Sequence, residues 1–243
     1  MAPHPTVAFD LDGTLVDTAP DLLDALNLVL REAALAPIGA DDARGLFGGG
    51  ARVLIERGLA FHGMRVDDAD IDKMQAHFLA YYEDHLADRS RPYPGAIETL
   101  DALRQRARLI VVTNKFERYS TKLLEALGLA RHFSVVAGPD TFGVRKPDPG
   151  HLLRAVARAG GDPAATIMIG DSMTDVATAR AAKVPVVVVS YGYSDVEAAA
   201  LGADRVIDRL DEAPAAVNAL LDEARAGGKP DREAPFGRPL ASD

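Results

Sequence analysis

Short runs of apolar, β-branched residues alternate with longer stretches of helical periodicity from about residue 93 onwards. The strand-like runs lie at 7–9, 109–112, 133–136, 167–169 and 186–189, with a weaker one at 205–207. Between them, apolar residues recur at helical spacing, for example Ile97, Leu100 and Leu103. This alternation is typical of a parallel sheet covered by helices. The pattern therefore predicts an α/β protein with a doubly wound, mostly parallel sheet.

The stretch from residue 18 to 92 has a different pattern. It contains no convincing strand, and apolar residues such as Leu22 and Leu26 recur at helical spacing. The segment 91–95 has two prolines two positions apart, which cannot lie inside a helix, so the helical stretch must close there. The prediction is a sheet domain of residues 1–17 and 93–227, interrupted by a helical insert of residues 18–92.

The composition is that of an ordinary globular chain. Of the 243 residues, 48% are hydrophobic and 26% are charged, so the chain can bury a sizeable core as one large domain or two unequal ones. Residues 228–243 are rich in proline, glycine and charge, and we expect them to form a disordered tail. No segment resembles a leader peptide or a membrane span, so we expect a cytoplasmic protein that does not contact a membrane.

Charge and cysteine content narrow the classes of function. The net charge is -9 and the basic residues form no long run, which argues against a nucleic-acid surface and favours a small-molecule substrate. The chain has no cysteine, which excludes disulfides and thiolate metal sites. Any metal must then be held by oxygen or imidazole ligands, which favours a hard cation. The sequence leaves both a monomer and a homodimer open.

Asp10 and Asp12 follow directly on the first predicted strand. Residues two apart on an extended chain point to the same side, and the carboxyl ends of parallel strands border the crevice where open α/β sheets bind ligands. Two adjacent carboxylates repel, so they need a cation or a shared proton. Such a site lets one stay ionised as a nucleophile while the other acts as an acid. The alternative is an Asp-rich turn that caps a helix.

Polar groups also follow the next two predicted strands. Thr113 and Asn114 come after the second strand, where a hydroxyl and an amide suit phosphate oxygens, unless they simply cap the next helix. Lys146 follows the third strand, and the prolines at 147 and 149 place it just before a helix as a candidate buried cation. The alternative for Lys146 is a solvated turn.

Asp171 and Asp175 follow the fourth predicted strand, and a helical turn would bring residues four apart onto one face. A capped helix start is the alternative. Four successive strand ends thus carry an acid pair, a hydroxyl, a lysine and a second acid pair. Ligand sites gather at the carboxyl ends of such sheets, so one shared site explains the pattern better than four coincidences.

These motifs resemble those of the haloacid dehalogenase-like hydrolase superfamily, and within it the phosphoglycolate phosphatases, over about residues 5–215. The resemblance implies a Rossmann-like sheet with a helical cap inserted after the first strand. It also implies the roles of the site residues: Asp10 as nucleophile, Asp12 as general acid and base, Thr113 and Asn114 as phosphate-binding residues, Lys146 as the cation that steadies the transferring group, and Asp171 and Asp175 as the acidic motif around Mg²⁺, with Asp175 either a ligand or a supporting residue.

The resemblance implies a two-step hydrolysis of a small phosphorylated metabolite, with 2-phosphoglycolate as the expected substrate. Asp10 would attack phosphorus, and Asp12 would protonate the departing alkoxide and then take a proton from the hydrolytic water. Mg²⁺ held by Asp10, the Asp12 backbone carbonyl, Asp171 and waters would offset the repulsion between nucleophile and phosphate.

Other members of the superfamily remain alternatives. Dehalogenases typically lack the second aspartate, because no leaving alkoxide needs a proton, so Asp12 favours phosphate chemistry. A phosphomutase of the β-phosphoglucomutase kind shares the nucleophile, the acid/base and the cap, and stays open. So does a promiscuous phosphatase for small phosphoesters. A binding protein without activity is disfavoured, because none of the family's motif residues is missing.

The insert is expected to set the choice of substrate. Gly49, Gly50 and Arg52 offer loop amides and a cation that suit a substrate carboxylate when a cap closes. Lys115 is a second candidate for the same role. The alternative is that the glycines merely join two helices and that Arg52 is a solvated surface charge.

Overall fold

The computed structural model describes residues 4–227, with a six-stranded sheet at the centre in the order β5-β4-β1-β6-β7-β8. The strands are β1 Thr6–Phe9, β4 Arg108–Val112, β5 Val135–Ala137, β6 Thr166–Gly170, β7 Val186–Val189 and β8 Arg205–Ile207. Every neighbouring pair is parallel, and β1 lies between β4 and β6. The predicted α/β, doubly wound parallel fold is therefore confirmed. The expected tail of 228–243 lies outside the described residues.

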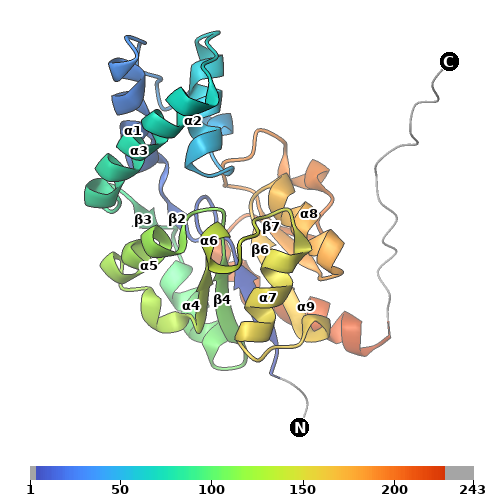
Figure 1. Ribbon diagram of the computed structural model, residues 1–243. Coiled ribbons are helices and arrows are strands. Elements are labelled where there is room, and N and C mark those ends of the chain that lie inside the picture. The colour runs from blue at the N-terminus through green and yellow to red at the C-terminus, as the bar shows by residue number, and fades with distance from the viewer. Residues whose placement is uncertain (1–3, 228–243) are drawn as a thin grey trace, which may run out of the picture.

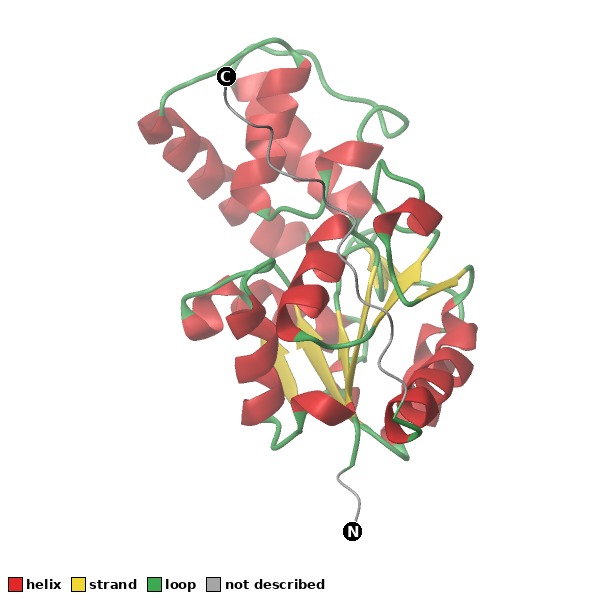
Figure 2. Cartoon of the chain, turned by 90° about the vertical axis from the view of Figure 1, so that its right-hand side faces the viewer, coloured by secondary structure: helices red, strands yellow, loops and turns green. Residues whose placement is uncertain are grey.

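Helices cover both faces of this sheet (Figure 2). Side chains alternate along β1, so Val7 and Phe9 belong to the core on one face and Ala8 to the core on the other. The face that carries Val7 and Phe9 is covered by α4 Ala96–Arg104, α5 Glu117–Ala126 and α9 Ala213–Arg225. The face that carries Ala8 is covered by α7 Pro149–Arg158 and α8 Met173–Ala182, and the short helix α6 Pro139–Phe142 lies beside α7. No helix within the described range is long and apolar enough to cross a membrane.

Three helices pack against one another beyond the sheet, at the top of Figure 1. They are α1 Ala19–Glu32, α2 Ala51–Phe61 and α3 Asp68–His85. The side chains of Leu26, Leu30 and Phe78 are buried in their shared core, as the helical spacing in this region predicts. We propose residues 18–92 as a cap domain whose α1 and α3 help to line a pocket at the carboxyl ends of β1 and β4.

Two very short strands join the cap to the sheet domain. β2 Val16–Asp17 and β3 Arg91–Pro92 pair in antiparallel fashion, with Val16 opposite Pro92. The expectation of no strand within 18–92 was therefore wrong at its last two residues. A two-residue strand has too few side chains to show an alternating pattern, so its formation depends on the partner segment.

Two details of the sheet domain differ from the sequence prediction. The third strand begins at Val135 and not at Phe133, whose ring packs edge-on against Phe9 instead. Ile97 was expected in a helical core pattern but is 41% exposed. The buried stripe of α4 starts one position earlier, at Ala96, and continues through Leu100 and Leu103, which leaves Ile97 about 100° away on the helix surface.

Candidate active site

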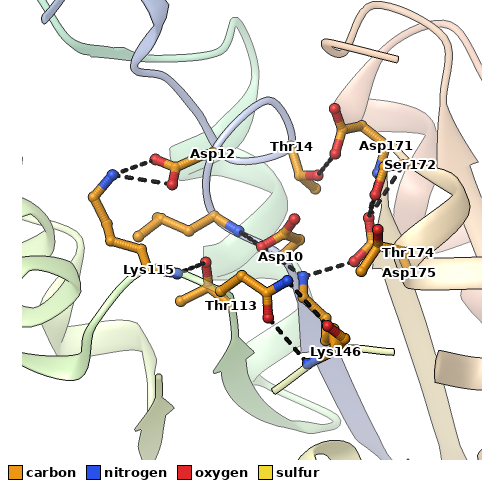
Figure 3. A network of polar contacts seen from close by, with 12 residues as sticks. Asp10, Asp12, Thr14, Thr113, Lys115, Lys146, Asp171, Ser172, Thr174 and Asp175 are labelled. Atoms are coloured by element: carbon orange, nitrogen blue, oxygen red, sulfur yellow. Dashed lines mark hydrogen bonds and ion pairs between the residues drawn. The ribbon is translucent and has the colours of Figure 1, made fainter. Parts of the chain in front are cut away.

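The carboxyl ends of β1, β4 and β6 bring most of the predicted site residues together (Figure 3). Asp10, Asp12, Thr113, Asn114 and Lys115 line one pocket. Carboxylate oxygens of Asp10, Asp171 and Asp175 lie within 4.8 Å of one another directly beside it. The strand order explains why these residues lie close together, because β1 is hydrogen-bonded to both β4 and β6.

Lys146 lies between two of these carboxylates. Its Nζ is 2.8 Å from Asp10 Oδ1 and donates to Asp175 Oδ1 at 2.7 Å, and the lysine side chain is 1% exposed. Burial lowers the pKa of Lys146, but Asp10 and Asp175 more than offset this and raise the pKa above its ordinary value. Lys146 is thus a buried cation, and the solvated-turn alternative is wrong.

Asp10 is held at one oxygen. Its Oδ1 accepts a bond from the backbone N–H of Leu11 at 2.7 Å and faces Lys146, whereas its Oδ2 has no hydrogen-bond donor among the described residues. Burial raises the pKa of Asp10 to about 6, and Lys146 limits the rise. A carboxylate with one oxygen anchored and the other available at a pocket wall is the arrangement that a nucleophile needs.

Asp171 sits in a tight cradle. Its Oδ2 accepts a bond from the backbone N–H of Tyr193 at 2.7 Å. A Cβ on Gly13 or Gly192 would come within 2.5 Å and 2.2 Å of Asp171, so both positions require glycine. Burial, together with Asp175 and Asp10, holds the pKa of Asp171 well above its usual range.

Asp175 is fully engaged by protein groups. Its Oδ2 accepts from the backbone N–H groups of Asp171 and Ser172 and from the Ser172 hydroxyl, while Oδ1 accepts from Lys146. Ser172 is the N-cap of α8, so the alternative of a capped helix start is correct for this segment and coexists with the acidic cluster. The contacts favour a supporting role for Asp175.

The cluster contains three buried carboxylates and one buried lysine, which contacts Asp10 and Asp175. The excess of negative charge, together with the raised pKa values of Asp10 and Asp171, fits a divalent cation. Oxygen ligands of this kind suit hard cations such as Mg²⁺.

Asp12 and Lys115 form a pair that the sequence analysis did not anticipate. Lys115 Nζ donates to both Asp12 oxygens, at 2.7 and 3.0 Å, and the Thr18 hydroxyl donates to Asp12 Oδ1 at 2.7 Å. Residues 12 and 115 are 103 positions apart, and only the pairing of β1 with β4 brings them together. Asp12 does not cap a helix, since α1 begins only at Ala19.

Thr113 and Asn114 do not cap a helix either, because α5 begins at Glu117 and its N-cap is Phe116. The Thr113 hydroxyl lies at the pocket and accepts a bond from the Lys115 backbone N–H at 3.2 Å. The Asn114 side chain bonds both the N–H and the carbonyl of Lys146, at 3.0 and 3.1 Å. The Asn114 side chain therefore positions Lys146, and the proposed phosphate contacts do not include Asn114.

Arg52 lies outside the pocket. Its guanidinium contacts three carboxylates on the cap surface, at 3.1 Å from Glu56 and 2.5 Å from Asp68 and Asp72. Gly49 is also absent from the pocket lining, whereas Gly50 is part of it. Because the charge of Arg52 is already matched on a different surface, we leave Arg52 and Gly49 out of the functional proposal.

Two aromatic residues at the site, Tyr193 and Tyr82, had no role assigned to them from the sequence. The Tyr193 hydroxyl accepts bonds from the backbone N–H groups of Thr18 and Ala19 at 2.6 and 2.8 Å, and donates to Asp17 at 2.7 Å. Tyr82 of α3 also lines the pocket. Both come from segments far from Asp10 in the chain, so neither shares a local motif with it.

The chain is similar to known phosphatases over most of its length. A family model for haloacid dehalogenase-like hydrolases matches residues 4–183. A phosphoglycolate phosphatase of Agrobacterium fabrum is 48% identical over 205 residues, 84% of this chain and 88% of the relative. The one from Caulobacter vibrioides is 45% identical over 222 residues, 91% and 94% of the two chains.

Two further proteins are similar at lower sequence identity. An N-acetylmuramic acid 6-phosphate phosphatase of Pseudomonas aeruginosa is 38% identical over 207 residues, 83% of this chain and 89% of the relative. A crystal structure of a predicted phosphoglycolate phosphatase from Haemophilus somnus superposes with a TM-score of 0.82 at 30% identity, covering 89% of this chain and 99% of that one. With its motif residues gathered at one sheet edge and a family match over most of its length, the chain belongs to the haloacid dehalogenase-like hydrolases.

Proposed function

We propose that the protein hydrolyses 2-phosphoglycolate to glycolate and phosphate through a phosphorylated Asp10. That the chain is a phosphoric monoester hydrolase follows from its family and its curated relatives. The observation that carries the mechanism is the geometry of Asp10, which is anchored at one oxygen beside Lys146 while it lines a pocket with Asp12 and Thr113.

Asp10 and its neighbours perform the first step. The unbonded oxygen of Asp10 attacks phosphorus, and Lys146 neutralises part of the charge on the transferring group. The Thr113 hydroxyl at the end of β4 donates to a phosphate oxygen. Since phosphoryl transfer needs mainly positioning and charge stabilisation, fixed groups on rigid strand ends suit it.

Asp12 serves as the acid and base. It gives a proton to the departing alkoxide in the first step and takes one from water in the second. The Thr18 hydroxyl, next to α1 of the cap, holds Asp12 at the edge of the pocket. This bond links the orientation of Asp12 to the start of the cap.

Mg²⁺ is the proposed cofactor. Asp10, Asp171 and the Asp12 backbone carbonyl would hold it, and Asp175 would position Asp171 and Lys146. The bound ion supplies positive charge that offsets the repulsion between a carboxylate and a phosphate.

The pocket has walls from both the sheet domain and the cap, because Leu54 and Phe78 line it together with Asp10 and Thr113. The relatives named phosphoglycolate phosphatase are 48% and 45% identical to this chain, whereas the N-acetylmuramic acid 6-phosphate phosphatase is 38% identical. This difference favours 2-phosphoglycolate over a phosphorylated amino sugar.

Phosphate release from a panel of substrates, with and without Mg²⁺, tests the proposal. We expect a magnesium-dependent preference for 2-phosphoglycolate over β-glucose 1-phosphate and other small phosphomonoesters. Asp10→Asn should lower turnover at least about 1,000-fold, because no other group can take the place of the nucleophile. Asp222→Asn, an exposed residue of α9, is the matched control and should retain the wild-type rate.

Each unfavourable outcome has a separate meaning. Equal, weak activity across the panel would retain a promiscuous phosphatase and remove the named substrate. Conversion of glucose 1-phosphate to glucose 6-phosphate without net phosphate release would replace the hydrolase by a mutase. Wild-type rates in Asp10→Asn would refute the phosphorylated-enzyme mechanism.

A further inference from the structure

The pocket contains a second group of polar atoms that the phosphoryl chemistry above does not use. The Tyr82 hydroxyl of α3, the Lys115 ammonium that follows β4, and the first residues of α2 all line the same pocket as Asp10 and Thr113. They come from three separate elements, two of them in the cap. Their convergence suggests a subsite for the part of the substrate that leaves.

Tyr82 is 1% exposed, and its hydroxyl is buried. Within the described range 4–227 this hydroxyl forms no hydrogen bond of normal geometry, although it interacts with the nearby Lys115 ammonium. A buried polar group left unpaired is costly, and native proteins usually satisfy such a group with water or a ligand. Burial raises the pKa of Tyr82 to about 12, so the hydroxyl stays protonated near neutral pH and acts as a donor.

Lys115 is the only cationic side chain among the described residues that line the pocket. It is 8% exposed, and its Nζ lies 4.8 Å from the centre of the Tyr82 ring. Its Nζ forms an ion pair with Asp12 at 2.7 Å, so Lys115 is present as an ammonium. A charged donor and a neutral donor therefore lie side by side in the pocket.

The amino end of α2 meets the same pocket. Gly50 is its N-cap, with a φ of 85°, and Gly50 and Ala51 both line the cavity. A Cβ on Gly50 would approach the backbone oxygen of Asn114 to 3.1 Å, so the helix begins in close contact with the end of β4. Unpaired N–H groups and the helix dipole make this end of an 11-residue helix favourable for negative charge.

We propose that Lys115, Tyr82 and the start of α2 form a receptor for a carboxylate on the leaving group of the substrate. One carboxylate oxygen accepts from Lys115 and the other from Tyr82. This inference rests on the proposed hydrolysis of a phosphomonoester, and it deepens that proposal by assigning the residues that recognise the carboxylate of the leaving group.

The receptor also changes the partner of Asp12. In this structure Lys115 bonds both Asp12 oxygens, and Thr18 bonds one of them. A substrate carboxylate competes for the Lys115 ammonium, while Thr18 keeps Asp12 in place. Binding of the acid thus releases Asp12 from Lys115, while the bond from Thr18 remains.

Two non-hydrolysable ligands test the receptor by calorimetry on the magnesium-loaded enzyme. In 3-phosphonopropionate a methylene group replaces the ester oxygen of 2-phosphoglycolate, and in propylphosphonate a methyl group also replaces the carboxylate. We expect the wild type to bind 3-phosphonopropionate at least about 10-fold more tightly. Lys115→Met should lower this preference about 10- to 100-fold and Tyr82→Phe about 3- to 10-fold, with propylphosphonate affinity nearly unchanged.

Matched controls separate the receptor from general damage to the cap. Tyr81→Phe changes a tyrosine on the same helix that stacks on His85 outside the pocket. Lys122→Met removes an exposed lysine of α5 whose Nζ donates to the Glu83 carbonyl. Both controls should keep the wild-type preference.

The outcomes distinguish the receptor from the proposed reaction. An unchanged preference in Lys115→Met and Tyr82→Phe would overturn the receptor, as would equal weakening of both ligands or no binding of either. If the wild type shows the Lys115-dependent preference but hydrolyses no phosphoester, the receptor stands and the proposed function fails. If it hydrolyses ethyl phosphate as well as 2-phosphoglycolate, the phosphatase stands and the receptor fails.

Discussion

At the scale of single residues, burial determines the character of the acidic groups. Asp10 and Asp171 are 6% and 4% exposed, and the burial of each raises its pKa. Lys146 opposes this effect at Asp10 because its ammonium lies 2.8 Å away. The metal-free site therefore holds ionised carboxylates at a cost in stability, which a bound cation would reduce.

The pKa of Asp10 predicts a pH dependence of folding stability. The folded value of about 6 exceeds the ordinary value of 3.8, so between about pH 4 and 6 the folded state binds more protons at this group than the unfolded chain. The contribution of Asp10 to stability therefore falls as the pH rises through this window. Asn at position 10 does not titrate, so metal-free Asp10→Asn should gain stability relative to the wild type between pH 4 and 7, by up to about 3 kcal/mol.

Urea unfolding in the presence of a chelator, at pH 4 and pH 7, measures this difference. The same wild-type-minus-variant free energy of unfolding at both pH values would show that Asp10 titrates normally. Asp222→Asn on the surface of α9 provides the reference for an exposed aspartate.

At the scale of elements, the loop after β7 connects the metal cluster to the cap. The backbone N–H of Tyr193 holds Asp171, its hydroxyl bonds the backbone before and at the start of α1, and its ring packs 5.0 Å from that of Phe47 in the cap. The hydroxyl donates once and accepts twice, which fills its capacity. One side chain thus sets the position of the first cap helix relative to the site.

Tyr193→Phe should destabilise the protein by about 1–3 kcal/mol, because it leaves the buried backbone N–H of Thr18 unpaired and removes the shorter of the two bonds of the Ala19 N–H, while the ring contact remains. Tyr191→Phe is the matched control, since it removes a single bond, to the carbonyl of Thr14. Urea unfolding of the two variants measures the effect. Equal losses in both would mean that the hydroxyl of Tyr193 does not hold the cap.

At the scale of the whole molecule, the site lies where two bodies of different architecture meet. The sheet domain supplies the acidic cluster and Lys146 (Figure 3). The cap, which contains α1, α2 and α3 (Figure 1), supplies Tyr82 and the start of α2 to the pocket. Only β2 and β3 and their flanking segments connect the two bodies along the chain. We therefore expect a metal ion at the acidic cluster to stabilise the sheet domain. A substrate in the pocket should also hold the cap against the sheet domain, because both line the pocket.

Mg²⁺ should raise the melting temperature of the wild type. At 10 to 100 times its Kd, binding contributes about 1.4–2.7 kcal/mol, and each kcal/mol shifts the midpoint of a chain this size by about 2–4 °C. Asp171→Asn should lose most of this shift, whereas Asp222→Asn should keep it. A full magnesium shift in Asp171→Asn, measured by calorimetric melting, would remove Asp171 from the metal site.

The amino-acid sequence by itself determined the fold class and the strand ends of the site. Buried parallel strands read as continuous apolar runs, and Asp10, Thr113 and Asp171 each stand just after such a run. Because parallel strands share one carboxyl edge, position along the chain was enough to predict that these residues lie close together. The presence of helices between residues 18 and 92 followed in the same way from the spacing of the apolar residues.

Only the tertiary structure decided which polar groups are partners. Lys115 pairs with Asp12, Asn114 holds the backbone of Lys146, and Tyr82 enters the pocket from the cap. Arg52, chosen from the sequence for its charge, instead contacts carboxylates on the cap surface. Local periodicity specifies which face of an element is buried, but the partner of a polar side chain depends on contacts between elements distant in the chain, and those are fixed only when the domains pack.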